Sequence, residues 1–294
     1  LKHLAENEAK TEEIPNVEYL KMFIDAKQFE GCSERTLQYY RVTIEHMLGS
    51  IDTPIRKITT DEIRGYLVDY QKVNNCSKVT VDNVRRNMSS FFSWLEEEDY
   101  ILKSPMRRIH KIKTKQPVKE TITDEMIEKL RDNCTCVRDL AMIDLLYSTG
   151  IRVGELVGLN ISDIDFEERE CIVFGKGDKE RRVYFDAKAK LHLQEYIESR
   201  TDDNPALFVT LDAPHARLKI SGVEIRVREL GRKLNIDKIH PHKFRRTMAT
   251  MAIDKGMPIE QVQKLLGHIK IDTTMEYAMV NQNNVKNSHR KYIT

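Results

Sequence analysis

Two basic side chains are spaced to bind one phosphoryl group near the start of a helix. His242 and Arg245 stand three residues apart in the run His240-Pro241-His242-Lys243-Phe244-Arg245-Arg246. Residues three apart share one face of a helix, and proline favours the first helical position. The first turn of a helix also directs backbone N–H groups and the positive end of its dipole toward an anion. The spacing therefore predicts a phosphate-binding pair.

A second arginine lies in the run Ser148-Thr149-Gly150-Ile151-Arg152-Val153-Gly154-Glu155-Leu156. Gly150 is placed to end a helix, because glycine tolerates the left-handed backbone that closes helices. Glu155 follows Arg152 by three residues and can share a helical face with it. The pattern predicts an arginine oriented by a carboxylate, although the same pair taken alone is more typical of a surface ion pair.

A histidine and a tyrosine complete the candidate chemistry. His268 follows Leu265-Leu266-Gly267, and Tyr277 comes nine residues after it. Opening a phosphodiester without a metal requires cations at the nonbridging oxygens, a nucleophile, and an acid for the leaving oxygen. A tyrosine hydroxyl can be the nucleophile. Taken alone, Tyr277 is one half-buried tyrosine among eleven, so the hypothesis depends on the whole set.

A lysine at the tip of a predicted hairpin could supply the acid. The strand-like runs 171–174 and 182–185 flank the turn Gly175-Lys176-Gly177-Asp178-Lys179. Its glycines permit the positive φ angles that tight hairpins need. Lys176 is the preferred candidate, with Lys179 as the alternative in the same loop.

Apolar residues at helical spacing predict four helices in the first third of the chain. Ser33, Thr60 and Ser77 are placed to cap the second, third and fourth of them. The apolar stripes should pack together as a small bundle. Phe91, Phe92 and Trp94 fit helix packing better than a base-stacking surface, so we expect them in the core.

A basic segment separates this bundle from the rest. Between residues 103 and 119 there are seven Lys or Arg and no acid, and Pro105 and Pro117 interrupt any helix. We predict a helical domain at 14–102, a basic linker at 103–119 and a second domain at 120–294. The basic residues assigned to DNA contact are Arg107, Arg108, Lys111, Lys113, Lys243 and Arg246.

The second domain mixes helices with a few strands. Helical patterns occupy about 124–133, 137–149, 187–200, 219–234, 242–255 and 258–266, and the two strand-like runs lie between them. The predicted fold class is therefore α+β, mainly α with a small β-sheet.

Bulk composition excludes several classes of protein. The 294 residues are 40% hydrophobic and 32% charged, and no apolar run approaches the roughly 20 residues that cross a bilayer. The five cysteines are odd in number and lack paired metal-ligand spacing, which favours reduced thiols in the cytoplasm. A net charge of +2 is modest for a DNA-binding protein, but nine Lys or Arg against three acids between Lys219 and Arg246 provide local basic character.

The order and spacing of these motifs resemble the tyrosine recombinase or phage integrase family, especially its compact Xer-type members. The first arginine motif is similar to Thr149–Leu156, the hairpin lysine to Gly175-Lys176-Gly177, and the second motif to His242-x-x-Arg245. The third is similar to Leu265-Leu266-Gly267-His268, followed by Tyr277. The resemblance covers nearly the whole chain and implies a SAM-like core-binding bundle followed by a catalytic domain. Arg246 departs from the pattern, since many relatives have a histidine there.

By this resemblance Tyr277 would form a 3′-phosphotyrosine, with no metal and no cofactor. Arg152 and Arg245 would bind the nonbridging oxygens with forked donors. Lys176 would protonate the leaving oxygen, His242 would assist proton transfer at Tyr277, and His268 would donate to the phosphoryl group. Glu155 is expected to support the site structurally.

The resemblance also implies partners. Four protomers would act on two double-stranded DNA sites through a Holliday junction, with the two domains closing around the duplex and residues 283–294 docking on a neighbouring protomer. An accessory DNA-bending protein or a second recombinase, and association with the nucleoid, are further expectations. Alternatives are a type IB topoisomerase-like nicking-closing enzyme or a catalytically idle architectural DNA-binding protein. Chromosome dimer resolution, integration of a mobile element and a further arm-binding domain all remain open.

Overall fold

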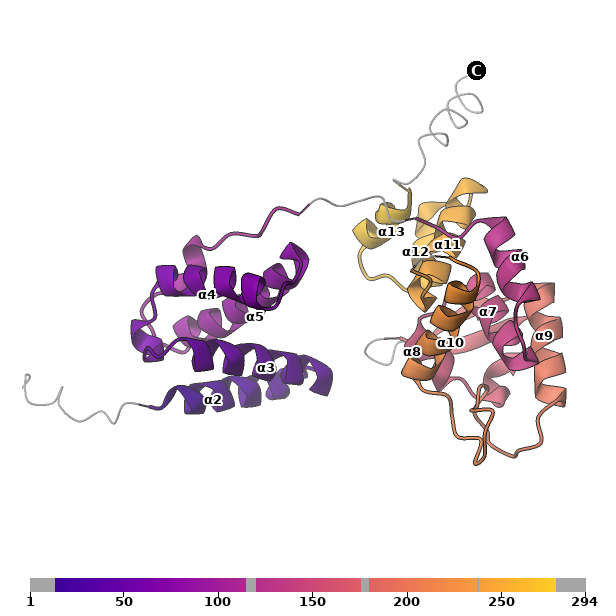
Figure 1. The fold of residues 1–294 in the computed structure, drawn as a ribbon, viewed down its shortest axis with the longest axis horizontal. Helices are drawn as coiled ribbons and strands as arrows, with labels where there is room; N and C mark the ends of the chain where they lie inside the picture. The colour runs from indigo at the N-terminus through magenta and orange to yellow at the C-terminus, as the bar shows by residue number, and fades with distance from the viewer. Residues whose placement is uncertain (1–13, 115–119, 176–179, 237, 279–294) are drawn as a thin grey trace, which may run out of the picture. The chain divides into compact units, whose positions relative to one another are not determined.

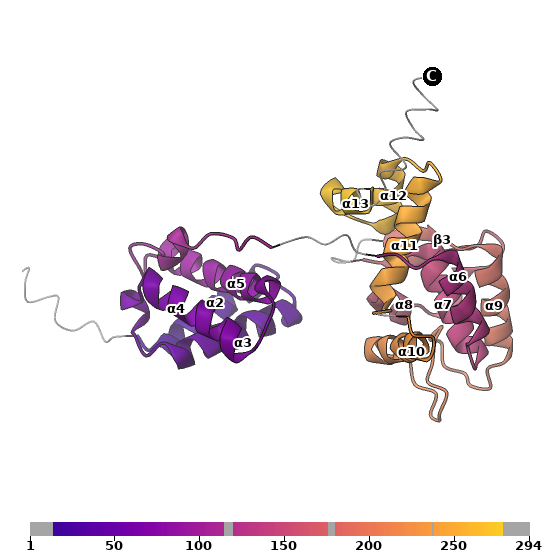
Figure 2. The same ribbon diagram turned by 45° about the horizontal axis from the view of Figure 1, so that its top comes forward.

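The computed structural model describes residues 14–114, 120–175, 180–236 and 238–278. The chain divides into two compact units, residues 1–116 and residues 117–294 (Figures 1 and 2). Each unit buries its own hydrophobic core. Within the described residues, no helix is long and apolar enough to cross a membrane.

The first unit is a helical bundle with two short 3-10 turns. Ser33 and Ser77 cap their helices as predicted, accepting from the backbone N–H of Thr36 and Thr80. The third cap is wrong by one residue, because Thr59 forms a reciprocal capping box with Glu62 and Thr60 is already helical. The elements are α2 (Asn16–Phe29), α3 (Glu34–Ser50), η1 (Ile55–Lys57), α4 (Thr60–Val73), α5 (Lys78–Glu97) and η2 (Pro105–Arg108).

Aromatic side chains fill the core of this bundle. Phe91 and Phe92 of α5 are fully buried, and Trp94 is 6% exposed. Phe23 of α2 contacts Phe91 edge to face, with ring centroids 5.2 Å apart. The prediction that this stripe is core is confirmed, because the rings are sealed between helices and present no surface to a base.

The first half of the predicted linker packs on the bundle. Met106 is 4% exposed, the hydroxyl of Thr60 donates to the carbonyl of Pro105 at 2.8 Å, and the N–H of Ile112 donates to Asp82 at 3.0 Å. The basic composition of this segment suggested a linker, but its apolar residues Met106, Ile109 and Ile112 pack into the core of the bundle. Residues 104–112 therefore belong to the packing of the first unit.

The second unit packs helices against the buried face of a small sheet, whose other face is exposed. Strands β1 (Ile164–Asp165), β2 (Glu170–Phe174) and β3 (Glu180–Tyr184) pair antiparallel in that order, with Cys171 opposite Val183. The predicted class, mainly α with a small sheet, is confirmed. The helices are α6 (Asp124–Asp132), α7 (Val137–Thr149), α8 (Val153–Gly158), α9 (Ala187–Glu198), α10 (Ile220–Lys233), α11 (Pro241–Asp254), α12 (Ile259–Leu266) and α13 (Ile271–Ala278), with a 3-10 turn η3 (Ile161–Asp163).

Two buried helices form the frame of this unit. α7 is buried around most of its circumference and packs against α9 and α11 (Figure 2). α11 in turn contacts α12 and α13. A helix that is apolar on most faces is buried by its neighbours, so the C-terminal end of α7 and the middle of α11 are fixed points from which side chains can be oriented.

Candidate active site

Arg152 is oriented at the junction between α7 and α8. Gly150 ends α7 in the left-handed conformation with φ of 62°, as predicted. Arg152 is the N-cap residue of α8, and both its backbone N–H and its guanidinium donate to Glu155, at 2.7 and 2.8 Å. The guanidinium also reaches the carbonyl of Gly267 at 3.3 Å. With 41% of its side chain exposed, Arg152 offers its remaining donors to a ligand.

Arg245 lies on α11 and is almost completely enclosed, at 1% exposure. Its guanidinium donates to the carbonyl of Gly150 at 2.8 Å and to that of Leu266 at 2.6 Å. Burial, followed by the nearby charge of Arg152, lowers the pKa of Arg245 to about 10. The side chain is therefore still a cation at neutral pH, and it ties the ends of α7 and α12 together.

His268 and Tyr277 complete the cluster. Nη2 of Arg245 lies 2.9 Å from Nε2 of His268, and the His268 ring stacks on Tyr277 with centroids 5.9 Å apart. Tyr277 is 6% exposed and packs with Met248 and Leu266. Four of the six predicted catalytic residues therefore form one contiguous network: Arg152, Arg245, His268 and Tyr277.

The other two predicted catalytic residues are His242 and Lys176. The His242 ring lies parallel to that of His240, with centroids 6.4 Å apart, and the charge of His242 is among the causes that lower the pKa of His268. Lys176 lies outside the described residues. The strands on either side of its loop are in place, with Phe174 paired to Glu180.

Glu155 has a second arginine partner that the sequence analysis missed. Arg181, on β3, donates to both carboxylate oxygens of Glu155, at 2.6 and 2.7 Å, and its Nε donates to the carbonyl of Leu265 at 3.0 Å. Burial opposes ionisation of Glu155, but the hydrogen bonds from Arg181 and Arg152 outweigh it and lower the pKa. Arg181 alternates with outward-facing Glu180 and Arg182 along β3. That alternation was the available signal for an inward arginine.

The residues assigned to DNA contact are placed very differently. Arg108, Lys111 and Lys113 are exposed on the first unit, and Arg107 is exposed there but ion-paired with Glu96. On α11, Lys243 and Arg246 are buried, at 6% and 8% exposure. Arg246 donates to the backbone carbonyl of Glu120 at 3.3 Å, so its position serves the packing of the chain that enters this unit.

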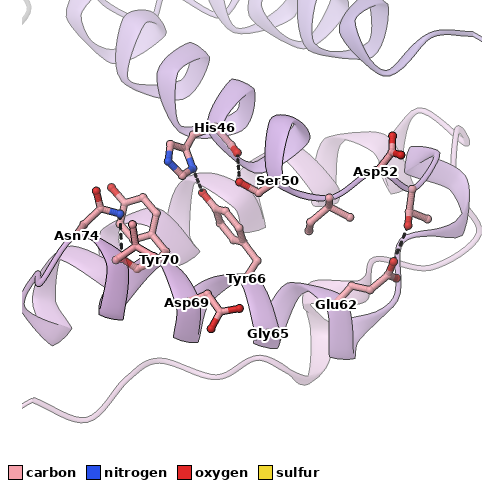
Figure 3. A pocket seen from close by; sticks show the side chains of 12 residues that line it. His46, Ser50, Asp52, Glu62, Gly65, Tyr66, Asp69, Tyr70 and Asn74 are labelled. Atoms are coloured by element: carbon pink, nitrogen blue, oxygen red, sulfur yellow. Dashed lines mark hydrogen bonds between the residues drawn. The ribbon is translucent and has the colours of Figure 1, made fainter.

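The first unit has a cavity of about 490 Å³, which is lined by other residues (Figure 3). Nδ1 of His46 on α3 lies 3.0 Å from the hydroxyl of Tyr66 on α4 inside it. Asp52, Glu62 and Asp69 also line it. Because these carboxylates would repel phosphate, we assign no DNA contact to this hollow.

Comparison with known proteins identifies the arrangement. Residues 118–284 match the model of the phage integrase family, and residues 19–102 match that of the phage integrase N-terminal SAM-like domain. This chain belongs to the phage integrase family. The resemblance seen in the sequence is thereby confirmed, together with the class of enzyme: it is a tyrosine recombinase, an enzyme that transfers DNA strands.

Individual relatives align with nearly the whole chain. A tyrosine recombinase XerC of Oceanobacillus iheyensis is 30% identical over 290 residues, and the alignment covers 93% of this chain and 95% of that protein. The crystal structure of XerA recombinase matches with a TM-score of 0.54 and 27% identity, covering 95% and 99% of the two chains. A lambda integrase tetramer bound to a Holliday junction shares the fold, with a TM-score of 0.71 at 19% identity over 86% and 77% of the chains.

Proposed function

We propose that Tyr277 attacks a phosphorus of duplex DNA, forming a 3′-phosphotyrosine bond while the P–O5′ bond breaks and a 5′-hydroxyl leaves. The reverse step rejoins the strand, so the energy of the bond is retained and the step needs neither a nucleotide nor a metal. The observation that carries the proposal is the convergence of Arg152, Arg245, His268 and Tyr277, which come from four separate elements.

Each side chain has a role that its chemistry allows. Arg152 and Arg245 would bind the nonbridging oxygens, because a planar guanidinium stays charged and presents two parallel donors. His268 would donate to the phosphoryl group, and His242 would accept the proton of Tyr277. Lys176 would protonate the leaving 5′-oxygen. Glu155, with Arg181, would keep Arg152 in place.

The assembly we propose is a tetramer on two DNA sites, exchanging strands through a Holliday junction. The tetrameric lambda integrase on such a junction supports this by its shared fold. In our proposal the first unit and the basic residues up to Lys113 bind the phosphate backbone, with affinity that falls steeply with salt. Residues 283–294, which lie outside the described residues, would dock on the neighbouring protomer.

We also propose where the recombinase acts in the cell. We place the recombinase in the cytoplasm on the nucleoid, acting in chromosome dimer resolution or in the movement of a genetic element. An accessory DNA-bending protein or a second recombinase would complete some assemblies.

The test is covalent capture on a nicked substrate. A DNA site selected from a random pool by binding is nicked so that the released 5′-hydroxyl fragment diffuses away, and a denaturing gel then detects protein bound to DNA. We expect an adduct with the wild type in the absence of magnesium, and none with Tyr277→Phe. An adduct that survives Tyr277→Phe, or a bound site that is never cleaved, would overturn the proposal. Exchange between two labelled sites separates recombination from simple nicking and closing.

A further inference from the structure

Both ring nitrogens of His268 are engaged, and by partners of different kinds. Nε2 lies 2.9 Å from Nη2 of Arg245, and Nδ1 lies 2.9 Å from Oγ1 of Thr274. A guanidinium has donors only, so Nε2 must be the acceptor in the first of these bonds. A neutral imidazole carries a single proton, which is then on Nδ1 and is donated to the Thr274 hydroxyl.

The electrostatics of the site favour this neutral ring. Burial, and then the charges of Arg245 and Arg152, lower the pKa of His268 to about 4. At neutral pH the ring is therefore uncharged in the free protein. Its Nε2 lone pair faces the arginine, and in this tautomer it has no proton to give to a phosphoryl oxygen.

Donation from Nε2 to a phosphoryl oxygen requires a proton on Nε2, which the neutral ring carries only in the opposite tautomer. Nε2 must gain a proton from solvent while Nδ1 loses one to solvent, so that the net charge of the half-buried ring does not change. Nδ1 then becomes an acceptor and needs a donor. A hydroxyl can accept in one state and donate in the other, whereas a carbonyl or carboxylate would fix the proton on Nδ1.

Thr274 also lies where it can relate the ring to the nucleophile. Its side chain is fully buried on α13, and Tyr277 follows three residues later, on the same face of that helix. The His268 ring stacks on Tyr277. A single short helix thus carries both the hydroxyl that orients His268 and the tyrosine that packs against it.

We propose that Thr274 is a positioning residue, whose hydroxyl holds the His268 ring and lets its proton move from Nδ1 in the free protein to Nε2 when phosphate is bound. This inference rests on the proposed function, in which His268 donates to the phosphoryl group. It assigns to a threonine a role that none of the predicted catalytic residues covers.

The first test compares three substitutions in the covalent capture assay. Thr274→Val keeps the shape of the side chain but removes the hydroxyl, and Thr274→Ser keeps the hydroxyl. Thr273→Val is the matched control, because Thr273 is the exposed neighbour on the same helix. We expect cleavage by Thr274→Val to fall about 10- to 100-fold, by analogy with residues that orient metal-binding histidines. Thr274→Ser should stay within about threefold of wild type, and Thr273→Val should be unchanged, all at temperatures well below melting.

The second test reads the tautomer directly. The ¹⁵N shifts of histidine distinguish a protonated ring nitrogen from an unprotonated one, and His268→Gln identifies the His268 signals in the full chain. We expect the proton on Nδ1 in free protein and on Nε2 in the complex of Tyr277→Phe with the selected DNA site. The free-protein spectrum does not depend on cleavage.

The outcomes are separable. Wild-type rates in Thr274→Val overturn the positioning role, and equal defects in Thr274→Val and Thr274→Ser show that packing rather than the hydroxyl matters. An unchanged tautomer on DNA overturns the proton shift. If the wild type forms no adduct on a bound site, the proposed function falls and this inference falls with it. If the adduct forms and a Thr274 test fails, only this inference is lost.

Discussion

Both terminal nitrogens of the Arg181 guanidinium donate to the carboxylate of Glu155, at 2.6 and 2.7 Å. The Arg181 side chain is only 11% exposed and that of Glu155 only 4%. Removing one partner of a buried ion pair costs about 3–5 kcal/mol when the other charge is left without compensation. At Glu155 the remaining bonds from Arg152 place the cost at the lower end of that range. The neighbouring Arg182 pairs with Glu170 but is 63% exposed, where ion pairs contribute about 0–1 kcal/mol.

We therefore expect Arg181→Met to lower the free energy of unfolding of the second unit by about 3 kcal/mol, and Arg182→Met by less than about 1 kcal/mol. Urea titration followed by circular dichroism measures the change. The single tryptophan, Trp94, lies in the first unit, so its fluorescence separates the unfolding of that unit. Equal effects of the two substitutions would contradict the prediction.

Substitutions of Arg152 and Arg245 should differ in their effect on stability, although we propose that both side chains bind the phosphoryl group. Loss of either charge should slow adduct formation by about 10²- to 10³-fold. Arg245→Ala also leaves the carbonyls of Gly150 and Leu266 without their donor in a buried place, so its melting temperature should fall clearly. Arg152→Ala removes a side chain that is 41% exposed and should melt close to wild type. Calorimetry and the capture assay together measure this; a destabilised Arg152→Ala would be the contrary result.

The lowered pKa of His268 predicts a pH-dependent stability. The folded pKa is about 4 against an ordinary 6.5, so between these values the unfolded chain binds more protons. The contribution of the neutral His268 ring to the free energy of unfolding is fully present above about pH 6.5 and is lost as the pH falls toward 4. The stability difference between wild type and His268→Gln should shrink by on the order of 2 kcal/mol over that window, after allowance for solvent screening. Parallel curves for the two proteins would rule this out.

Two glycines with left-handed backbone should respond differently to alanine. Gly150, with φ of +62°, would place a Cβ 2.2 Å from Cε of Met248, whereas Gly256, with φ of +94°, faces open space. Backbone strain costs about 1–2 kcal/mol at either position, and crowding adds roughly 1–3 kcal/mol at Gly150. We expect Gly150→Ala to be the more destabilising in urea titration, and also to slow cleavage, because its carbonyl accepts from Arg245. A larger loss at Gly256 is the opposing outcome.

Lys111 and Lys113 are exposed basic residues that we propose contact phosphate. If each neutralises one phosphate, its replacement by alanine lowers the slope of log affinity against log salt by about 0.9. Arg107→Ala is the comparison, since Arg107 is already ion-paired with Glu96 and should change the slope less. Fluorescence anisotropy with labelled DNA across a salt series measures the three slopes, and identical slopes in all variants would exclude these lysines from contact.

Local patterns were sufficient for most of the fold. Capping by Ser33 and Ser77 and the left-handed end of α7 at Gly150 depend on residues that are neighbours in sequence. The sequence also predicted the helical elements and the hairpin strands to within a few residues. Thr59 was missed as a cap because two threonines stand side by side, and only the reach of Glu62 selects between them.

The site was predictable in its motifs but not in its connections. Arg181 and Thr274 lie in ordinary positions of a strand and a helix, and their partners, Glu155 and His268, become visible only when the chain is folded. The same applies to Arg246, whose charge indicated a phosphate contact although its guanidinium is turned toward a backbone carbonyl. Charge counts cannot distinguish an exposed arginine from one that satisfies buried oxygens.

The start of the second unit is attached to the helix that carries His242 and Arg245. Arg246 donates to the carbonyl of Glu120, and the hydroxyl of Thr247 accepts from the N–H of Ile122 at 2.9 Å. Any mechanical load carried along the incoming chain is therefore transmitted to α11 within two residues of Arg245. The attachment couples α11 mechanically to the residues that begin the second unit.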